Sequence, residues 1–109
     1  IVGDLNASPD EGDGIKSGIQ GLLKHKLVND SILPRSEGGS VHTPDNQYSP
    51  QHTAEWAMRA DYVLPSRSLE VKGSGVFWPK PDDPLFRLTK DRKNSSDHRL
   101  VWVDIAVTK

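Results

Sequence analysis

The stretch Leu100-Val101-Trp102-Val103-Asp104-Ile105-Ala106-Val107 carries the clearest strand signal in the sequence. Every second residue from Val101 onward is aliphatic, whereas the intervening positions mix apolar and polar side chains. Successive side chains of a strand point to opposite faces, so this alternation predicts a β-strand over residues 100–107 with one wholly apolar face. The stretch therefore predicts that the domain is built on a sheet.

Further strands are expected upstream of this one. Residues 60–65 and 69–78 are apolar and β-prone, and residues 1–6 resemble the tail of a strand that runs into a loop. Gly73 and Gly75 predict a bend or bulge in the strand over residues 69–78. Strands separated by one helix and long loops indicate an α+β or α/β architecture, with sheet edges that need partners.

One amphipathic helix and one long loop are expected between these strands. Apolar residues at helical spacing predict the helix over residues 15–27, with Asp13 as its N-cap. Residues 34–51 are polar, aperiodic and rich in turn formers, which predicts an extended surface loop. The expected apolar stripe of the helix comprises Ile15, Ile19, Leu22, Leu23 and Leu27.

The composition is that of a small polar domain. The 109 residues include 14 Lys plus Arg and 15 Asp plus Glu, which gives a formal net charge of −1. This balance argues against a dedicated nucleic-acid scaffold but not against an enzyme that acts on phosphate esters. The chain has no cysteine, which excludes disulfides and cysteine metal sites. It also has no apolar run of about 18 residues, so no transmembrane segment is predicted.

The first polar cluster is Gly3-Asp4-Leu5-Asn6, at the exit of the first expected strand. Asp4 and Asn6 are two residues apart, so both side chains project from the same face if the backbone is extended. A carboxylate beside an amide suits activation of water next to a hydrogen bond to a phosphate oxygen. The alternative is a turn in which both side chains cap local backbone groups.

The second polar cluster lies at the start of the strand over residues 60–65. Asp61 enters an apolar strand there, and burial of a carboxylate is costly unless it is paired or hydrogen-bonded. Arg59 lies on the same strand face, so a simple Arg59–Asp61 pair is the alternative to a functional role for Asp61.

The third polar cluster, Ser95-Ser96-Asp97-His98-Arg99, directly precedes the last strand. In an extended backbone, Asp97 and His98 point to different sides, so one can hold a metal while the other reaches a substrate. Histidine is the side chain best suited to proton transfer near neutral pH. The alternative is an ordinary polar surface loop.

Several other polar and aromatic residues have weaker contexts. The remaining histidines, His25, His42 and His52, lie in polar stretches without ligand spacing and are expected to be solvated. Trp56 and Trp102 are expected in packing roles, whereas Trp78, beside Pro79, is the tryptophan expected to be exposed.

Taken in order, the three clusters resemble one protein family. Gly-Asp-x-Asn, then Arg-x-Asp-Tyr-Val-Leu, then Ser-Asp-His before a final apolar strand resembles the C-terminal half of the endonuclease/exonuclease/phosphatase superfamily, the deoxyribonuclease-I-like fold. The resemblance extends from Ile1 to about Ile105. It implies an α+β chain in which residues 1–109 form the C-terminal portion of one domain, part of a two-sheet α/β sandwich whose N-terminal half is missing.

The resemblance also implies a function and a role for each matching residue. Members of this family are metal-dependent phosphoesterases, usually with Mg²⁺, and Mn²⁺ and Ca²⁺ are the alternatives. Asp4 matches the acid that activates the attacking water and helps to bind the metal, and Asn6 matches the amide that contacts the phosphate. Asp61 matches the carboxylate that orients the catalytic imidazole, His98 matches that imidazole, and Asp97 matches an acidic residue of the metal site.

The substrate implied is a phosphoester, with nucleic acid among the candidates. The Val63-Leu64-Pro65-Ser66 and Val76-Phe77-Trp78-Pro79 segments look most like bacterial, often exported members, which implies a periplasmic or secreted location. The family's metal-binding Glu, a further Asn and a second His have no counterpart in this sequence. The 109 residues alone are therefore expected to be a poor or inactive catalyst.

Two other hypotheses differ in what they require of the structure. A non-catalytic binding module of the same fold would keep the site residues together, whereas an unrelated turn-rich binding domain would scatter them. A hydrogen bond between Asp61 and His98 is the sharpest single test.

Overall fold

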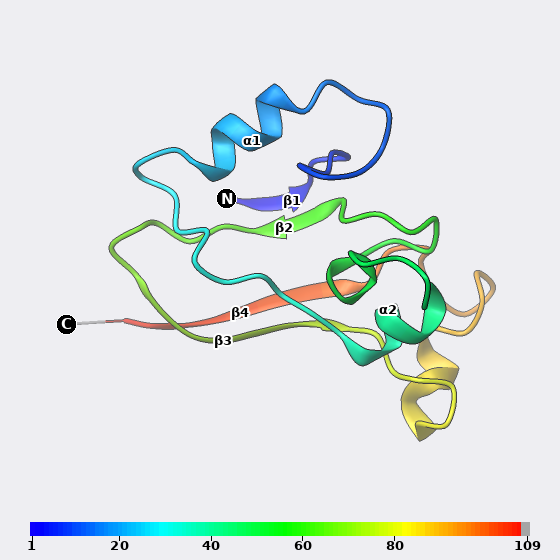
Figure 1. Ribbon diagram of the computed structural model, residues 1–109. Helices are drawn as coiled ribbons and strands as arrows, with labels where there is room; N and C mark the ends of the chain where they lie inside the picture. The colour runs from blue at the N-terminus through cyan, green and yellow to red at the C-terminus, as the bar shows by residue number, and fades with distance from the viewer. Residues whose placement is uncertain (108–109) are drawn as a thin grey trace.

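The computed structural model describes residues 1–107 of the chain and contains two small antiparallel sheets. In the first sheet, β1 (Val2–Asp4) pairs with β2 (Asp61–Val63), and in the second, β3 (Glu70–Phe77) pairs with β4 (Leu100–Ala106). β2 lies beside β4, so the two sheets adjoin (Figure 1). This mixed α/β arrangement confirms the predicted class and is consistent with part of a deoxyribonuclease-I-like fold.

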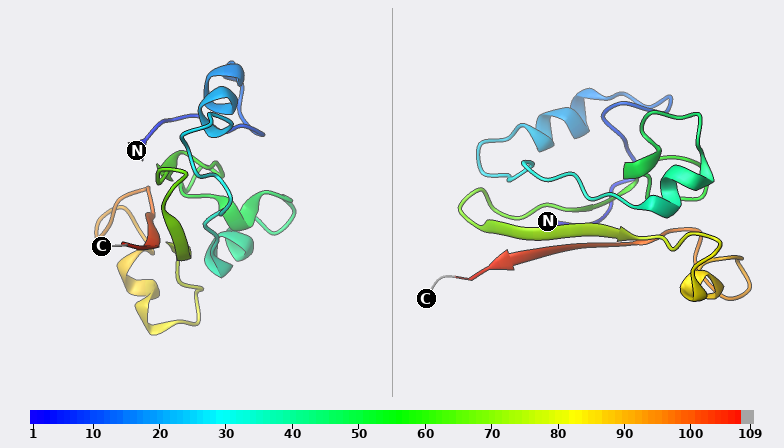
Figure 2. Two further views of the ribbon diagram at one scale, coloured as in Figure 1. Left: turned by 90° about the vertical axis from the view of Figure 1, so that its left-hand side faces the viewer. Right: turned by 60° about the horizontal axis from the view of Figure 1, so that its bottom comes forward.

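β4 keeps the alternation predicted from the sequence. Val101, Val103 and Ile105 are half-buried, whereas Leu100, Trp102 and Asp104 on the other face are exposed. The two strands of the β3–β4 ribbon run side by side, and residues 78–99 connect them at one end (Figure 2). This connection includes the short 3₁₀ helix η2 (Pro84–Leu88).

The predicted bulge is present in β3. The register of β3 against β4 shifts between Val71 and Gly73. Gly75 lies directly under the indole of Trp102, where an added Cβ would come within 2.8 Å of Nε1. Because Gly75 has no side chain, the indole of Trp102 can lie against the strand at this position.

The main apolar core fixes the position of β2. It joins Ile19 and Leu23 of α1 (Ser17–Leu23) to Val28, Tyr62 and Leu64. The Tyr62 hydroxyl donates a 2.6 Å hydrogen bond to the carbonyl oxygen of Ala7, and burial raises the pKa of Tyr62 to about 12. The phenol therefore stays neutral and ties the loop after β1 to β2.

α1 is shorter than the helix predicted over residues 15–27. It begins after Lys16, which takes the N-cap position in place of Asp13 and makes no side-chain cap hydrogen bond. Ile15 and Leu27 are 90% and 66% exposed, so they do not belong to the buried stripe. The helix ends at Leu23, and beyond it the Leu27 backbone amide donates to His25 Nδ1 in a local turn.

The expectation of an irregular loop over residues 34–51 is wrong. This segment contains α2 (Glu37–His42) and the 3₁₀ helix η1 (Ser49–Gln51). Ser36 caps α2 by accepting a 2.9 Å hydrogen bond from the Gly39 amide. A Cβ on Gly38 would overlap the Trp78 carbonyl oxygen, so this glycine permits close packing and does not mark a turn.

Trp78 is correspondingly buried, contrary to the prediction that it is exposed. It is 6% exposed and packs beside the His42 ring and the Arg99 guanidinium. Trp56 and Trp102 are instead the half-exposed tryptophans, each 46% exposed.

None of the helices found within residues 1–107 has the length and hydropathy needed to cross a bilayer.

Candidate active site

The site begins with two carboxylates that the first sheet places face to face. Asp4 ends β1, Asp61 begins β2, and the two residues are direct partners in the antiparallel register. Like charges directly opposite one another destabilise a sheet unless a third group compensates. The imidazole of His98 lies next to both carboxylates.

His98 forms the hydrogen bond that the sequence predicts. Its Nδ1 atom lies 2.8 Å from Oδ2 and 3.1 Å from Oδ1 of Asp61, and its Nε2 atom lies 3.9 Å from Oδ2 of Asp4. The hydrogen bond to Asp61 is the main cause of a raised His98 pKa, and the charges of Asp61, Asp4 and Asp97 act in the same direction. These contacts stabilise the protonated form of the ring relative to a free imidazole, and Nε2 is directed toward Asp4.

Thr53 is a further member of the site that the sequence analysis missed. Its hydroxyl donates a 2.7 Å hydrogen bond to Oδ2 of Asp61 and accepts from the amides of Ala60 and Asp61 at 2.9 and 3.0 Å. Thr53 is only 1% exposed, and its carbonyl oxygen accepts from the Arg99 amide at 2.7 Å. One residue thus links Asp61 to the backbone that carries His98, and no motif in the sequence marks it.

Asn6 does not share a strand face with Asp4. β1 ends at Asp4, and Asn6 adopts a left-handed backbone with φ of 47°. The backbone amide of Asn6 donates to Oδ1 of Asp4 at 2.8 Å, so Asp4 caps a local turn, as in the alternative considered above. This bond engages one oxygen of Asp4 and leaves Oδ2 on the side of His98.

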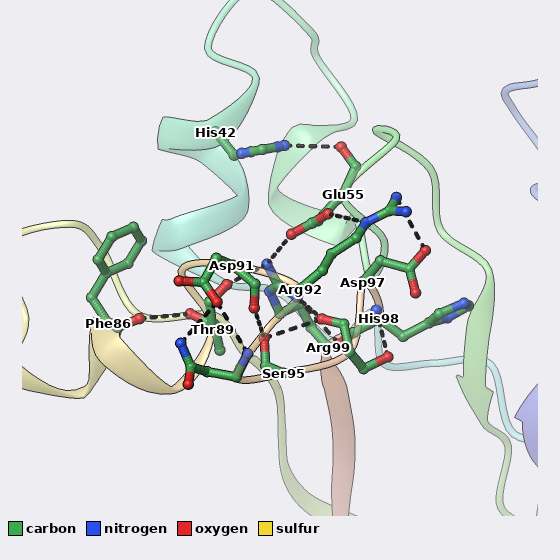
Figure 3. Close-up of polar contacts among 12 residues, drawn as sticks. His42, Glu55, Phe86, Thr89, Asp91, Arg92, Ser95, Asp97, His98 and Arg99 are labelled. Carbon is green, nitrogen blue, oxygen red and sulfur yellow. Dashed lines mark hydrogen bonds and ion pairs between the residues drawn. The ribbon is translucent and has the colours of Figure 1, made fainter.

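Asp97 and His98 point to different sides, as the extended spacing predicts. The Asp97 carboxylate lies 3.4 Å from Arg92 Nη2, whereas His98 turns away toward β2 (Figure 3). Arg92 also lies 3.4 Å from Glu55, whose other oxygen accepts from the buried Arg99 at 3.2 Å. Asp97 therefore belongs to an ion-pair network beside the Asp4–Asp61–His98 cluster, not to the cluster itself.

Two expectations about neighbouring polar residues are corrected. Arg59 does not pair with Asp61; its guanidinium lies 4.3 Å from the centre of the Tyr62 ring. His52 is fully buried and not solvated, and its Nε2 lies 2.7 Å from Oε1 of Glu11. His25 and His42 are exposed, as expected.

Asp4, Asp61 and His98 each offer a ligand atom, and these atoms all lie within 4.8 Å of one another. Two carboxylates and an imidazole form a donor set suited to a divalent cation. Three predicted site residues, Asp4 at the end of β1, Asp61 at the start of β2 and His98 just before β4, therefore converge, which contradicts the hypothesis of scattered, chance motifs.

Comparison with known proteins agrees with this geometry. The model of the Endonuclease/Exonuclease/phosphatase family matches residues 1–98. The chain belongs to this family. The match ends on His98 and so includes every predicted site residue. No curated protein and no solved structure gave a significant match.

Membership in the endonuclease/exonuclease/phosphatase family indicates a hydrolase of the phosphoester type. The family generally depends on divalent metals, and the Asp4–Asp61–His98 cluster is the corresponding candidate site in this chain.

Proposed function

We propose that this domain is a divalent-metal-dependent phosphoesterase that hydrolyses its substrate by direct attack of water. The observation that carries the proposal is the position of His98, whose Nδ1 is held by Asp61 while Nε2 faces Asp4. A carboxylate that accepts from one ring nitrogen fixes the tautomer and orients the other nitrogen toward the substrate.

The roles of the four polar residues follow from this arrangement. Asp4 accepts a proton from water while the water oxygen bonds to phosphorus, and the bond to the leaving oxygen breaks. The protonated His98 ring donates from Nε2 to a phosphoryl oxygen and offsets the charge that grows there. Asn6 donates its side-chain amide to another phosphoryl oxygen, and the departing alkoxide takes its proton from solvent. Asp61 holds the imidazole in place throughout.

A divalent cation would be held at the cluster by Asp4, while Asp61 keeps its bond to His98. The family resemblance adds Asp97 as a second ligand, although Asp97 lies outside the cluster. Mg²⁺ prefers oxygen ligands and retains several waters, so two carboxylates suit it, as they suit Mn²⁺ or Ca²⁺. When bound, the cation supplies positive charge that polarises a phosphoryl oxygen. Because Asp97 lies 3.4 Å from Arg92, its carboxylate must exchange this guanidinium for the ion.

The test is hydrolysis of bis(p-nitrophenyl) phosphate and p-nitrophenyl phosphate by the purified chain with Mg²⁺ or Mn²⁺. We expect turnover that is slow, because the family's Glu, further Asn and second His have no counterpart in these residues. It should disappear with EDTA and in His98→Ala, and persist in Asp104→Asn, which changes an exposed carboxylate on β4. Measurable metal-dependent turnover that is equal in His98→Ala and the unmodified chain would overturn the proposal, whereas phosphate binding without turnover would favour a non-catalytic module of the same fold.

A further inference from the structure

A cavity of about 530 Å³ lies beside the Asp4–Asp61–His98 cluster. Two residues connect the cavity with the cluster. Asn6 lines the cavity and donates its backbone amide to Asp4, and Trp56 lines it while its ring and the His98 ring pack in a T-shaped pair, 5.0 Å between centroids. A group bonded to a phosphate at the cluster can therefore extend into this cavity.

The cavity combines an aromatic and thioether surface with negative charge. Trp56 is 46% exposed, and Met58 lies beneath the glycine loop, 3.3 Å from where a Cβ on Gly12 would be. Glu11 and the exposed Asp13 contribute carboxylates to the lining. Among residues 1–107, no lysine, arginine or histidine is part of this lining.

Hydrogen bonds hold the Glu11 carboxylate of the cavity lining in place. Both oxygens of Glu11 are engaged, Oε1 by His52 at 2.7 Å and Oε2 by Asn46 at 2.7 Å, so this carboxylate is held in a fixed position. The nearby Lys16 ammonium donates to the backbone carbonyl oxygens of Glu11 and Gly12. Lys16 thereby stabilises the loop itself.

These features favour a positively charged organic group over an anionic one. A tryptophan face attracts ammonium and quaternary ammonium ions, and the attraction grows when the site excludes water. Carboxylates add to it, whereas they repel a second phosphate. A polarizable and flexible thioether can pack against the methyl groups of such a cation.

We propose that the cavity is a specificity site for an alkylammonium group, so that the preferred substrates are phosphoesters whose alcohol carries a quaternary or protonated amine. This inference rests on the proposed function, since it places that alcohol next to the phosphate held by His98. Trp56, Met58 and Asp13 are its specificity-determining residues.

The experiment compares choline with its uncharged isostere 3,3-dimethylbutan-1-ol in the EDTA-treated chain at constant ionic strength. Met58 is the only methionine of the chain, so its ¹³C-labelled methyl group gives a single NMR signal from the cavity wall. We expect both compounds to shift this signal, with choline binding about tenfold more tightly.

Matched variants assign the preference to the cavity. Trp56→Leu should bring the two affinities close to equality, whereas Trp102→Leu, which alters a tryptophan of the same 46% exposure on β4, should not. Asp13→Asn should reduce the preference, whereas Asp104→Asn should leave it unchanged. Equal affinities in the unmodified chain, or equal losses in Trp56→Leu and Trp102→Leu, would overturn the inference.

The result of the choline-binding experiment can be separated from that of the hydrolysis assay, because the binding experiment needs neither metal nor turnover. A chain that prefers choline but hydrolyses no phosphoester contradicts the proposed function and retains the cation site. A chain that hydrolyses phosphoesters without this preference contradicts the cation site alone.

Discussion

The Nδ1 atom of His98 lies 2.8 Å from Oδ2 of Asp61. Asp61 is in turn the direct cross-strand partner of Asp4, so one imidazole serves two carboxylates that would otherwise repel each other. The sheet register places two negative charges opposite each other, and the imidazole of His98, two residues before β4, offsets their repulsion. Structural stability and the proposed chemistry therefore depend on the same three side chains.

This relationship predicts the titration of His98. In the metal-free chain its pKa should lie above the ordinary value of 6.5, mainly because of the Asp61 hydrogen bond. Since the folded-state pKa is the raised one, this stabilisation is fully present below pH 6.5 and is lost as the pH rises through the folded-state pKa. An NMR titration with EDTA present, together with urea unfolding at several pH values, measures both effects.

Asp61→Asn is the variant that tests the cause. It removes the charge and replaces the carboxylate acceptor of the ring with a neutral amide, so the His98 pKa should fall toward 6.5. Asp104→Asn serves as the control, because Asp104 lies on the exposed face of β4. An unchanged His98 pKa in Asp61→Asn would show that the Asp61 carboxylate does not set it.

Thr53 should matter both for stability and for the proposed activity. Thr53→Val removes the donor to Asp61 and leaves the Ala60 and Asp61 amides without their acceptor. We expect unfolding to become easier by about 1–3 kcal/mol, the cost of leaving buried polar groups unsatisfied. Thr53→Ser keeps the hydroxyl and should recover most of the stability and turnover. Equal denaturation curves for Thr53→Val and the unmodified chain would contradict this role.

Arg92 should compete with a metal ion for Asp97. Arg92 is 71% exposed and its contacts with Asp97 and Glu55 are 3.4 Å long, so Arg92→Gln should change the free energy of unfolding by less than about 1 kcal/mol. The same variant frees the Asp97 carboxylate, and Mn²⁺ should then bind more tightly, as measured by isothermal titration calorimetry. Asp97→Asn should weaken Mn²⁺ binding. Unchanged or tighter Mn²⁺ binding in Asp97→Asn would remove Asp97 from the proposed metal site.

The parts of the site that could be predicted from the sequence were those with local signals. Alternation identified β4, and the ordered clusters placed Asp61 and His98 in contact, because each lies at the end of a strand whose position the family pattern fixes. The prediction that Asn6 shares a strand face with Asp4 is wrong because β1 ends at Asp4 and Asn6 adopts a left-handed backbone. The sequence around Asn6 is equally compatible with an extended backbone.

The parts that could not be predicted depend on partners far away in the sequence. His52 occurs in a polar stretch, yet Glu11 and the surrounding fold bury it completely. Thr53 acts through Asp61, and only the fold brings its hydroxyl to that carboxylate. Trp78 is buried because α2 packs against it. The sequence does not predict α2, because the pair Gly38-Gly39 at its start is typical of a loop.

That pair of glycines gives a sharp test of the packing around the site. In Gly38→Ala, the new methyl group would overlap the Trp78 carbonyl oxygen, and backbone atoms cannot rotate away as a flexible side chain can. We expect destabilisation of about 1–3 kcal/mol or more, the usual cost of overpacking. Gly21→Ala is the matched control, since Gly21 lies in α1 with nothing within 4 Å of the point that a Cβ would occupy, and alanine there should stabilise the chain by about 1 kcal/mol. Urea denaturation of the two variants should therefore shift in opposite directions, and a stable Gly38→Ala chain would mean that α2 does not pack against Trp78.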